Sequence, residues 1–60
     1  MINGERIRQA REIRGFTQIA LAERIGVKQP AIAQIEAGKI NPTDERFQKI
    51  ALQTGFPLSF

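Results

Sequence analysis

The side chains most suited to chemistry in this 60-residue chain are amides and amines in one short segment. Lys28, Gln29 and Gln34 all follow Gly26 at close spacing. A glutamine amide carries a donor and an acceptor side by side, which suits two hydrogen bonds to the edge of adenine. Because the amide is neutral, it approaches a base without taking a full charge out of water. The segment therefore indicates recognition of nucleic acid.

Two residue types that catalysis uses most are missing, since the chain contains neither cysteine nor histidine. Their absence excludes disulfides, thiolate metal sites, imidazole ligands and Ser-His or Cys-His nucleophiles. Carboxylates and lysines are the ionisable groups left for acid–base work, and nothing in the sequence pairs them. We therefore predict that the chain is not an enzyme and has no metal or cofactor.

The charge balance is basic, with nine Lys and Arg against six Asp and Glu. A formal charge of +3 favours a polyanionic partner, either nucleic acid or an anionic membrane, but it is also an ordinary charge for a soluble protein. No long apolar run follows the N-terminal charges, so neither a signal peptide nor a membrane span is predicted. We expect a cytoplasmic protein without membrane association.

The glutamine segment needs helices to position it, and the first is expected after Asn3, which can act as its N-cap. Its apolar residues, Ile7, Ala10 and Ile13, recur every three positions. Gly15 suits the left-handed conformation that ends a helix.

A second helix is expected to begin after Thr17, another N-cap residue. Leu21, Ala22 and Ile25 lie on one face of that helix, which should stop at Gly26. We expect Val27, in the turn that follows, to point into the core.

The third helix is predicted over residues 29–37, with Ala31, Ile32 and Ile35 on its apolar side and Gly38 at its end. An Asn-Pro-Thr turn at 41–43 precedes a fourth helix that should end at Gly55. The apolar stripe of this fourth helix consists of Phe47, Ile50 and Ala51.

The fold class follows from the helical spacing of the apolar residues, because no segment shows the alternation of apolar and polar residues that is typical of a strand. We predict an all-α bundle of four to five short helices, the fifth beginning near Pro57. Residues 1–60 are interpreted as a single domain. Its apolar last residues, Leu58-Ser59-Phe60, suggest the N-terminal part of a longer protein.

Two short helices joined at Gly26 could form a helix-turn-helix, in which the third helix leaves the second at roughly 90–120°. A third helix that leaves at this angle projects from the body as a ridge, and a ridge one helix wide fits the major groove of DNA. Spacing alone fits a plain corner between two bundle helices equally well. The outward residues Lys28, Gln29 and Gln34 favour the DNA interpretation, since a corner that needs only solubility usually carries Glu and Lys there.

The motif that points to a family consists of Phe16-Thr17-Gln18, Leu21-Ala22, Gly26-Val27, Gln29, Ile32, Ile35-Glu36 and Gly38. Together these residues resemble the helix-turn-helix domain of the Cro/C1 repressor type, also called the XRE family, over about residues 4–55. The resemblance implies a five-helix domain of a transcriptional regulator that binds double-stranded DNA, usually as a homodimer on a two-fold operator.

The resemblance also implies roles for individual residues. Gln18 would bind a phosphate at the start of the second helix and brace Gln29, which would read a base edge. Lys28 and Gln34 fall on positions that touch bases or nearby backbone, and Lys39 falls on a loop position beside phosphates.

Other positions match family residues that hold the helices together, or depart from the family pattern. Arg11 and Glu36 match a pair that ties the first helix to the third. Thr17 is expected to be a cap first and a phosphate contact second. Pro30 and Ala33 occupy base-reading positions without a side-chain hydrogen bond, so Pro30 offers only apolar contact, for example to a thymine methyl group.

Lys28 is itself a departure, because the family commonly has Ser or Thr there as the cap of the third helix. Lysine cannot cap, and its charge lies near the positive end of the helix dipole. A phosphate opposite the charge would relieve this destabilisation, which favours a DNA role for Lys28.

Two other interpretations stay open. The same fold could be a protein-interaction module, such as an antitoxin-type or partner-binding domain, acting through Ile19, Leu58 and Phe60. Residues 50–60 also resemble the junction before a zinc-peptidase domain of the ImmA/IrrE type, which would make a C-terminal peptidase-like domain part of the full-length protein. No HExxH motif is present in this chain.

Overall fold

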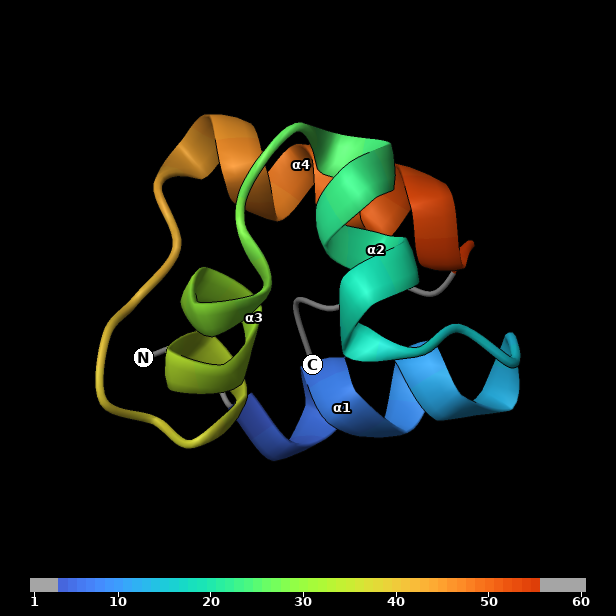
Figure 1. Cartoon of the computed structure of the whole chain (residues 1–60), viewed down its shortest axis with the longest axis horizontal. Coiled ribbons are helices and arrows are strands. Elements are labelled where there is room, and N and C mark those ends of the chain that lie inside the picture. Colours follow the sequence, from blue (N-terminus) through green and yellow to red (C-terminus); the bar gives the residue numbers. More distant parts are fainter. Residues whose placement is uncertain (1–3, 56–60) are drawn as a thin grey trace.

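Four α-helices make up most of residues 4–55, the part of the chain that this computed structural model describes. They are α1 (Gly4–Ile13), α2 (Gln18–Ile25), α3 (Gln29–Glu36) and α4 (Asp44–Thr54), as Figure 1 shows. Within this range there is no strand and no helix long and apolar enough to cross a membrane. The all-α prediction is confirmed, whereas the expected Asn3 cap and the fifth helix near Pro57 lie outside the described residues.

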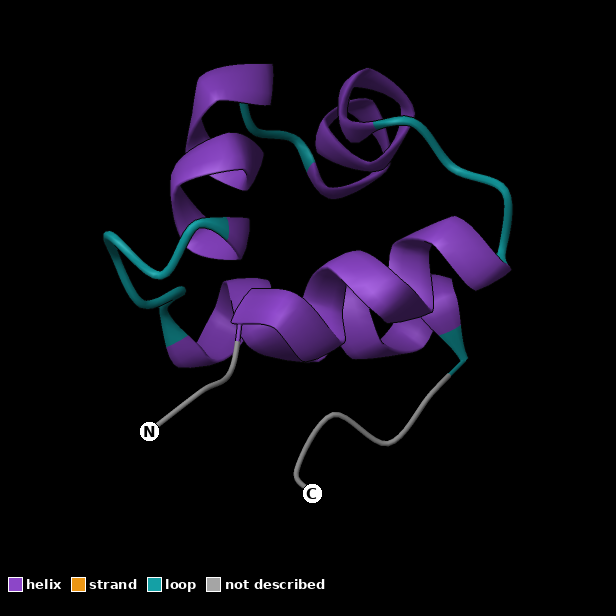
Figure 2. Cartoon of the chain, turned by 90° about the horizontal axis from the view of Figure 1, so that it is seen from below, coloured by secondary structure: helices purple, strands orange, loops and turns teal. Residues whose placement is uncertain are grey.

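The helices form two layers, with α2 and α3 on one side and α1 and α4 on the other (Figure 2). Helix α2 packs against both α3 and α4, and α1 packs against the same two helices. Helices of eight to eleven residues are marginal alone, so each is held by its neighbours rather than by its own propensity. This arrangement leaves one side of α3 at the surface.

The core contains one completely buried aliphatic side chain from each helix: Ile7, Leu21, Ile32 and Ile50, all 0% exposed. Burial of such a side chain contributes about 1.5–3 kcal/mol. The remaining buried apolar residues were also predicted from their spacing, and they are Ala10, Ala22, Ile25 and Ile35. Val27 and Phe47 are partly buried and pack against this cluster.

The prediction for the end of α1 was wrong, because Ile13 is 69% exposed while Arg11 is only 8% exposed. A step of six residues from Ile7 turns the helix by roughly 600°, which leaves Ile13 about 120° away from the buried face. Arg11, four residues from Ile7, returns to that face instead. The buried stripe of α1 therefore consists of Gly4, Ile7, Ala10 and Arg11.

The turn between α2 and α3 is a Schellman motif. Gly26 adopts φ 77°, and its N–H points to the Glu23 carbonyl at 3.4 Å. The Val27 N–H donates to the Ala22 carbonyl at 2.9 Å. Left-handed backbone suits glycine, which is why the chain can reverse here within two residues. Helix α3 ends at Glu36, one residue before the predicted boundary, with Ala37 as its C-cap.

Thr17 caps the start of α2, as predicted, and Thr43, the last residue of the predicted turn, caps the start of α4. The Thr17 Oγ1 accepts a hydrogen bond from the Ala20 N–H at 3.0 Å, and the Thr43 Oγ1 accepts one from Arg46 at 3.2 Å. These bonds satisfy backbone donors that have no partner inside the helix.

Replacing Thr17 by alanine is expected to lower the free energy of unfolding by about 1 kcal/mol, because the Ala20 N–H loses its acceptor. Urea denaturation followed by circular dichroism measures this loss. The Thr17→Ser variant keeps the hydroxyl and serves as the control. Equal midpoints for Thr17→Ala and the parent chain would show that this cap contributes nothing.

A close approach between α1 and α3 depends on Gly4, which the sequence interpretation did not single out. A Cβ at this position would lie 2.6 Å from the Glu36 carbonyl oxygen and would also clash with that of Ile35. No side chain fits between the start of α1 and the end of α3 without a shift. Gly4 therefore sets how close Glu36 comes to α1.

Candidate nucleic-acid interface

The outward side of α3 consists of short, uncharged residues. Pro30 and Gln34 are exposed and Ala33 is half-buried, whereas Ile32 and Ile35 face the core. The one charged residue within α3, Glu36, is buried. Small neutral side chains let the helix backbone come near another surface without the removal of charges from water.

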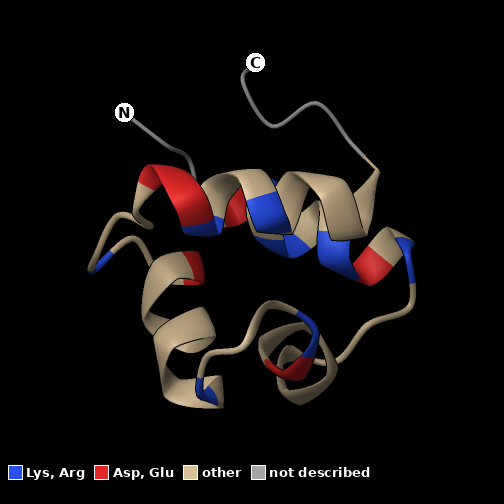
Figure 3. Ribbon diagram, turned by 90° about the horizontal axis from the view of Figure 1, so that it is seen from above, with Lys and Arg blue, Asp and Glu red and all other residues tan. Residues whose placement is uncertain are grey.

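Cationic residues flank this neutral helix at both ends. Lys28 precedes α3 and Lys39 follows it, and both are exposed. Figure 3 shows Lys or Arg positions in blue near both ends of α3. The positive charge is thus separated from the neutral surface. A polyanion with an uncharged interior, such as a duplex with phosphates on its rims and bases in its groove, matches this pattern.

The first turn of α3 has no side-chain cap. Lys28 is the N-cap residue with extended backbone, and its side chain makes no capping hydrogen bond. Lysine has three donors and no acceptor, so it cannot satisfy a backbone N–H. Pro30, in the first helical turn, is tolerated because it has no N–H to satisfy.

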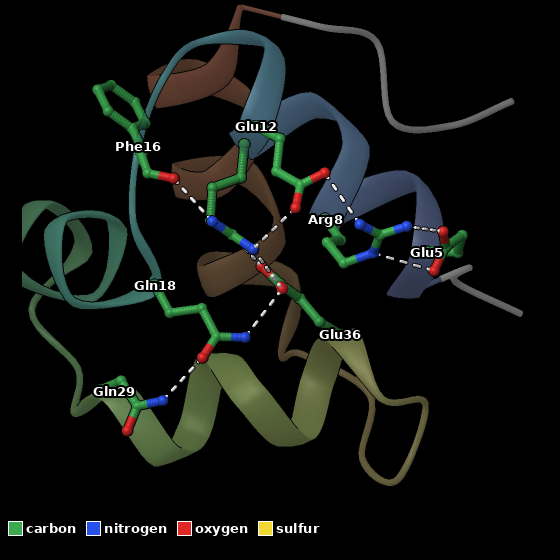
Figure 4. A network of polar contacts seen from close by, with 8 residues as sticks. Glu5, Arg8, Glu12, Phe16, Gln18, Gln29 and Glu36 are labelled. Atoms are coloured by element: carbon green, nitrogen blue, oxygen red, sulfur yellow. Dashed lines mark hydrogen bonds and ion pairs between the residues drawn. The ribbon is translucent and has the colours of Figure 1, made fainter.

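Arg11 and Glu36 form a buried ion pair that joins α1 to α3 (Figure 4). The Arg11 Nε donates to Glu36 Oε2 at 2.7 Å, and its Nη2 donates to Oε1 at 3.1 Å. The Nη1 of the same side chain donates to the Phe16 carbonyl at 2.7 Å. One guanidinium therefore ties together α1, the end of α3 and the loop before α2.

Two glutamines extend this pair toward the start of α3. The Gln18 Nε2 donates to Glu36 Oε1 at 3.1 Å, and the Gln29 Nε2 donates to Gln18 Oε1 at 2.7 Å (Figure 4). Gln29 was expected to face outward, but it is half-buried and bonded to α2 through one N–H. The bond to Gln18 uses one N–H of the Gln29 amide, so the Oε1 and the second N–H remain for contacts with a ligand.

The sequence contained no signal for the bond between Gln18 and Glu36. The two residues are separated by eighteen positions, and each has a plausible partner elsewhere: Gln29 for Gln18 and Arg11 for Glu36. Only the packing of α2 across α3 brings the amide and the carboxylate together. We refer to Arg11, Glu36, Gln18 and Gln29 as the polar chain.

Two arginines outside the polar chain, Arg8 and Arg24, have partners within the protein: glutamates for the first and an aromatic ring for the second. Arg8 bonds to Glu5 and to Glu12, the latter at 2.9 Å, and its hydrogen bond lowers the pKa of the Glu5 carboxyl. The Arg24 guanidinium lies 4.5 Å from the centre of the Phe16 ring, within the range of a cation–π contact. The Arg8 and Arg24 side chains are therefore held by contacts within the protein.

Comparisons with known proteins point to one family. A family model described as helix-turn-helix, HTH_3, matches residues 7–60. The DNA-binding domain of the P22 C2 repressor (1–76), determined in solution, is 30% identical and has a TM-score of 0.86. The match covers 95% of this chain and 75% of that chain. No curated protein matches the chain.

The Schellman turn and the packing of α3 on α2 lie within the matched range, which begins inside α1. The resemblance to the Cro/C1 type is confirmed, and the chain belongs to the HTH_3 helix-turn-helix family.

Proposed function

We propose that this chain is the sequence-specific DNA-binding domain of a transcriptional regulator, with α3 in the major groove of double-stranded DNA. Family membership and the likeness to a repressor DNA-binding domain support a DNA-binding regulator. The observation that carries the proposal for α3 is Gln29, whose amide is held by α2 and retains one acceptor and one donor.

Base reading by α3 follows from its outward residues. Adenine offers an N6 amino donor and an N7 acceptor in the major groove, which pair with the Oε1 and the second N–H of Gln29. Gln34, exposed farther along the helix, is proposed as a second polar contact. Pro30 and Ala33 have no polar side-chain atoms, so their proposed contacts are apolar and suit thymine methyl groups.

Phosphate contacts are proposed at both ends of α3 and at the start of α2. Lys28 and Lys39 supply charge beside a neutral helix. Thr17 and Gln18 lie at the start of α2, where backbone N–H groups and the helix dipole favour an anion. These contacts would fix the register of α3 on the duplex without carrying base information.

Selection of bound duplexes from a random pool tests the proposal most directly. A regulator domain should enrich a half-site with adenine at one position, and a homodimer should enrich two half-sites at a fixed spacing. Enrichment of no sequence, combined with binding that is indifferent to salt, would contradict the proposal.

Replacing Lys39 by alanine is expected to weaken binding to all duplexes alike and to reduce the log–log salt slope by about 0.9, the value for one phosphate. Titrations at several salt concentrations, with an operator and a random duplex, measure both effects. Arg8→Ala, on the opposite layer and already paired with two glutamates, is the control. Loss of base preference in Lys39→Ala would contradict a pure phosphate role.

Replacing Lys28 by serine is expected to raise the free energy of unfolding by about 0.5–2 kcal/mol, because serine caps α3 where lysine does not. The same change should weaken DNA binding through the lost charge. Lys28→Met separates the two effects, since it removes the charge without supplying a cap. A Lys28→Ser variant that binds DNA as tightly as the parent would refute the phosphate contact.

Several broader features belong to this proposal. We propose that residues 1–60 form one domain of a non-enzymatic, cytoplasmic protein that acts as a homodimer and as a repressor. We also propose a C-terminal peptidase-like domain in the full-length protein, on the resemblance of residues 50–60 to the junction before such a domain.

A protein-interaction module is the second candidate function. The observation that favours it is the exposure of Ile19, 61%, at the start of α2. Leu58 and Phe60, the other residues of that hypothesis, lie outside the described residues. Tight pairing with a protein, beside DNA binding that ignores sequence and salt, would favour this alternative.

A further inference from the structure

We infer that Glu36, buried at the end of α3, determines which way the amide of Gln29 points at the start of the same helix. It thereby selects the strand on which Gln29 reads adenine. This inference rests on the proposed function, because it assumes that α3 faces base edges. Glu36 is a positioning residue, which acts on the base through Gln18 and Gln29 without touching DNA.

The direction of the polar chain begins at the carboxylate. Both Glu36 oxygens accept hydrogen bonds from Arg11, at 2.7 and 3.1 Å, and an ionised carboxylate has no proton to donate. Any amide that approaches this group must therefore turn its nitrogen toward it. Gln18 does so, with its Nε2 at 3.1 Å from Glu36 Oε1.

The orientation of Gln18 then determines the orientation of Gln29. An amide with its nitrogen toward Glu36 presents its oxygen on the other side, and that oxygen accepts from Gln29 at 2.7 Å. Only the Nε2 of Gln29 can meet it, since two carbonyl oxygens cannot share a hydrogen bond. Gln29 is left with its Oε1 and one N–H in a defined order.

Reversal of the Gln29 amide would break this order at a cost. It would place the Gln29 oxygen against the Gln18 oxygen, or would require Gln18 to turn its own oxygen toward the Glu36 carboxylate. Either arrangement loses a hydrogen bond within a part-buried network and leaves acceptors facing each other. The carboxylate thus biases an amide that would otherwise rotate between two equivalent positions.

The order of donor and acceptor matters in the groove because A·T and T·A pairs present their groups in opposite order across it. An amide held in one orientation suits one of the two pairs, whereas an amide that rotates freely suits both. Guanine presents two acceptors, N7 and O6, and matches neither orientation. The polar chain should therefore govern the choice between A·T and T·A more than the choice against G·C.

The decisive variant is Arg11→Met/Glu36→Leu, which removes the ion pair as a unit and leaves both glutamines in place. Apolar replacement of a whole buried pair is often tolerated, and thermal unfolding checks that the variant folds. The preference of the parent for A·T over T·A at the Gln29 position should be about 5-fold to 150-fold, the range for one bidentate contact. It should fall to near parity in the variant, while G·C stays disfavoured.

Lys49→Met/Glu45→Leu is the matched control, since it removes an exposed ion pair that lies on another helix, α4. It should keep the parent preference. A second variant, Gln18→Met, cuts the polar chain while the Arg11–Glu36 pair stays intact, and it too should lose the choice between A·T and T·A. If the double variant does not fold, the base preference of Gln18→Met shows whether the polar chain sets the choice between A·T and T·A.

A measurement without DNA separates this inference from the proposed function. In NMR spectra of the parent chain, one Nε2 proton of Gln18 and one of Gln29 should exchange with water more slowly than those of exposed Gln34. Exchange as fast as that of Gln34, or an unchanged A·T preference in the folded variants, would overturn the inference. Slow exchange in a parent that shows no base preference would instead count against the proposed function.

Discussion

Replacing Glu36 by alanine is expected to remove most of the stability of the domain. Loss of one partner of a buried ion pair costs about 3–5 kcal/mol, because the other charge stays buried without compensation. A chain of 60 residues has a total stability of about 3–9 kcal/mol, at roughly 0.05–0.15 kcal/mol per residue. Arg11, 8% exposed, would lose its two bonds to Glu36 and keep only the Phe16 carbonyl and the more distant Glu12 carboxylate, at 3.9 Å, and Gln18 would lose its acceptor as well.

Urea denaturation of Glu36→Ala and of Glu45→Ala makes this test specific. Glu45 is an exposed glutamate on α4 whose ion pair with Lys49 is also exposed, so its removal should cost about 0–1 kcal/mol. Similar midpoints for the two variants would show that the buried pair contributes no more than a surface pair.

Replacing Gln29 by alanine is expected to cost about 1–3 kcal/mol of binding free energy at one base position, or about 5-fold to 150-fold in affinity, and to relax the base preference there. Alanine has no hydrogen-bonding group with which to tell one base from another. Competition titrations with operators that differ at single positions measure the loss. The fold should survive, because Gln29 is only half-buried and lies in the first turn of α3.

Gln34→Ala is the positional control for this prediction. It removes the other outward amide of α3, so any change in preference should fall on a different base pair. If Gln29→Ala keeps both the affinity and the base preference of the parent, α3 is not the element that reads the sequence.

Features that depend on neighbours along the chain could be predicted from the sequence. The caps at Thr17 and Thr43 are local, because each hydroxyl bonds to a backbone N–H three residues later. The end of α2 at Gly26 is local for the same reason, since a left-handed residue there needs glycine. Helix number and most of the core follow from such signals together with the helical period.

Features that depend on how the helices cross could not be predicted in this way. Arg11 is buried in α1 and Ile13 is exposed, and the burial of Arg11 depends on the carboxylate that Glu36 supplies from another helix. The tight fit at Gly4 involves the carbonyl oxygens of Ile35 and Glu36, far along the chain. The family resemblance implied the contact between Gln18 and Gln29, but not the bond from Gln18 to Glu36, which needs α2 packed across α3.

Helix α3 contains two sets of residues, one buried and one facing outward. Ile32, Ile35 and Glu36 hold the scaffold, whereas Pro30 and Gln34 are exposed. A duplicated gene can therefore acquire a new target sequence by changes at the exposed positions while the scaffold keeps its amino acids. The same separation makes this domain suitable for directed evolution of its target preference.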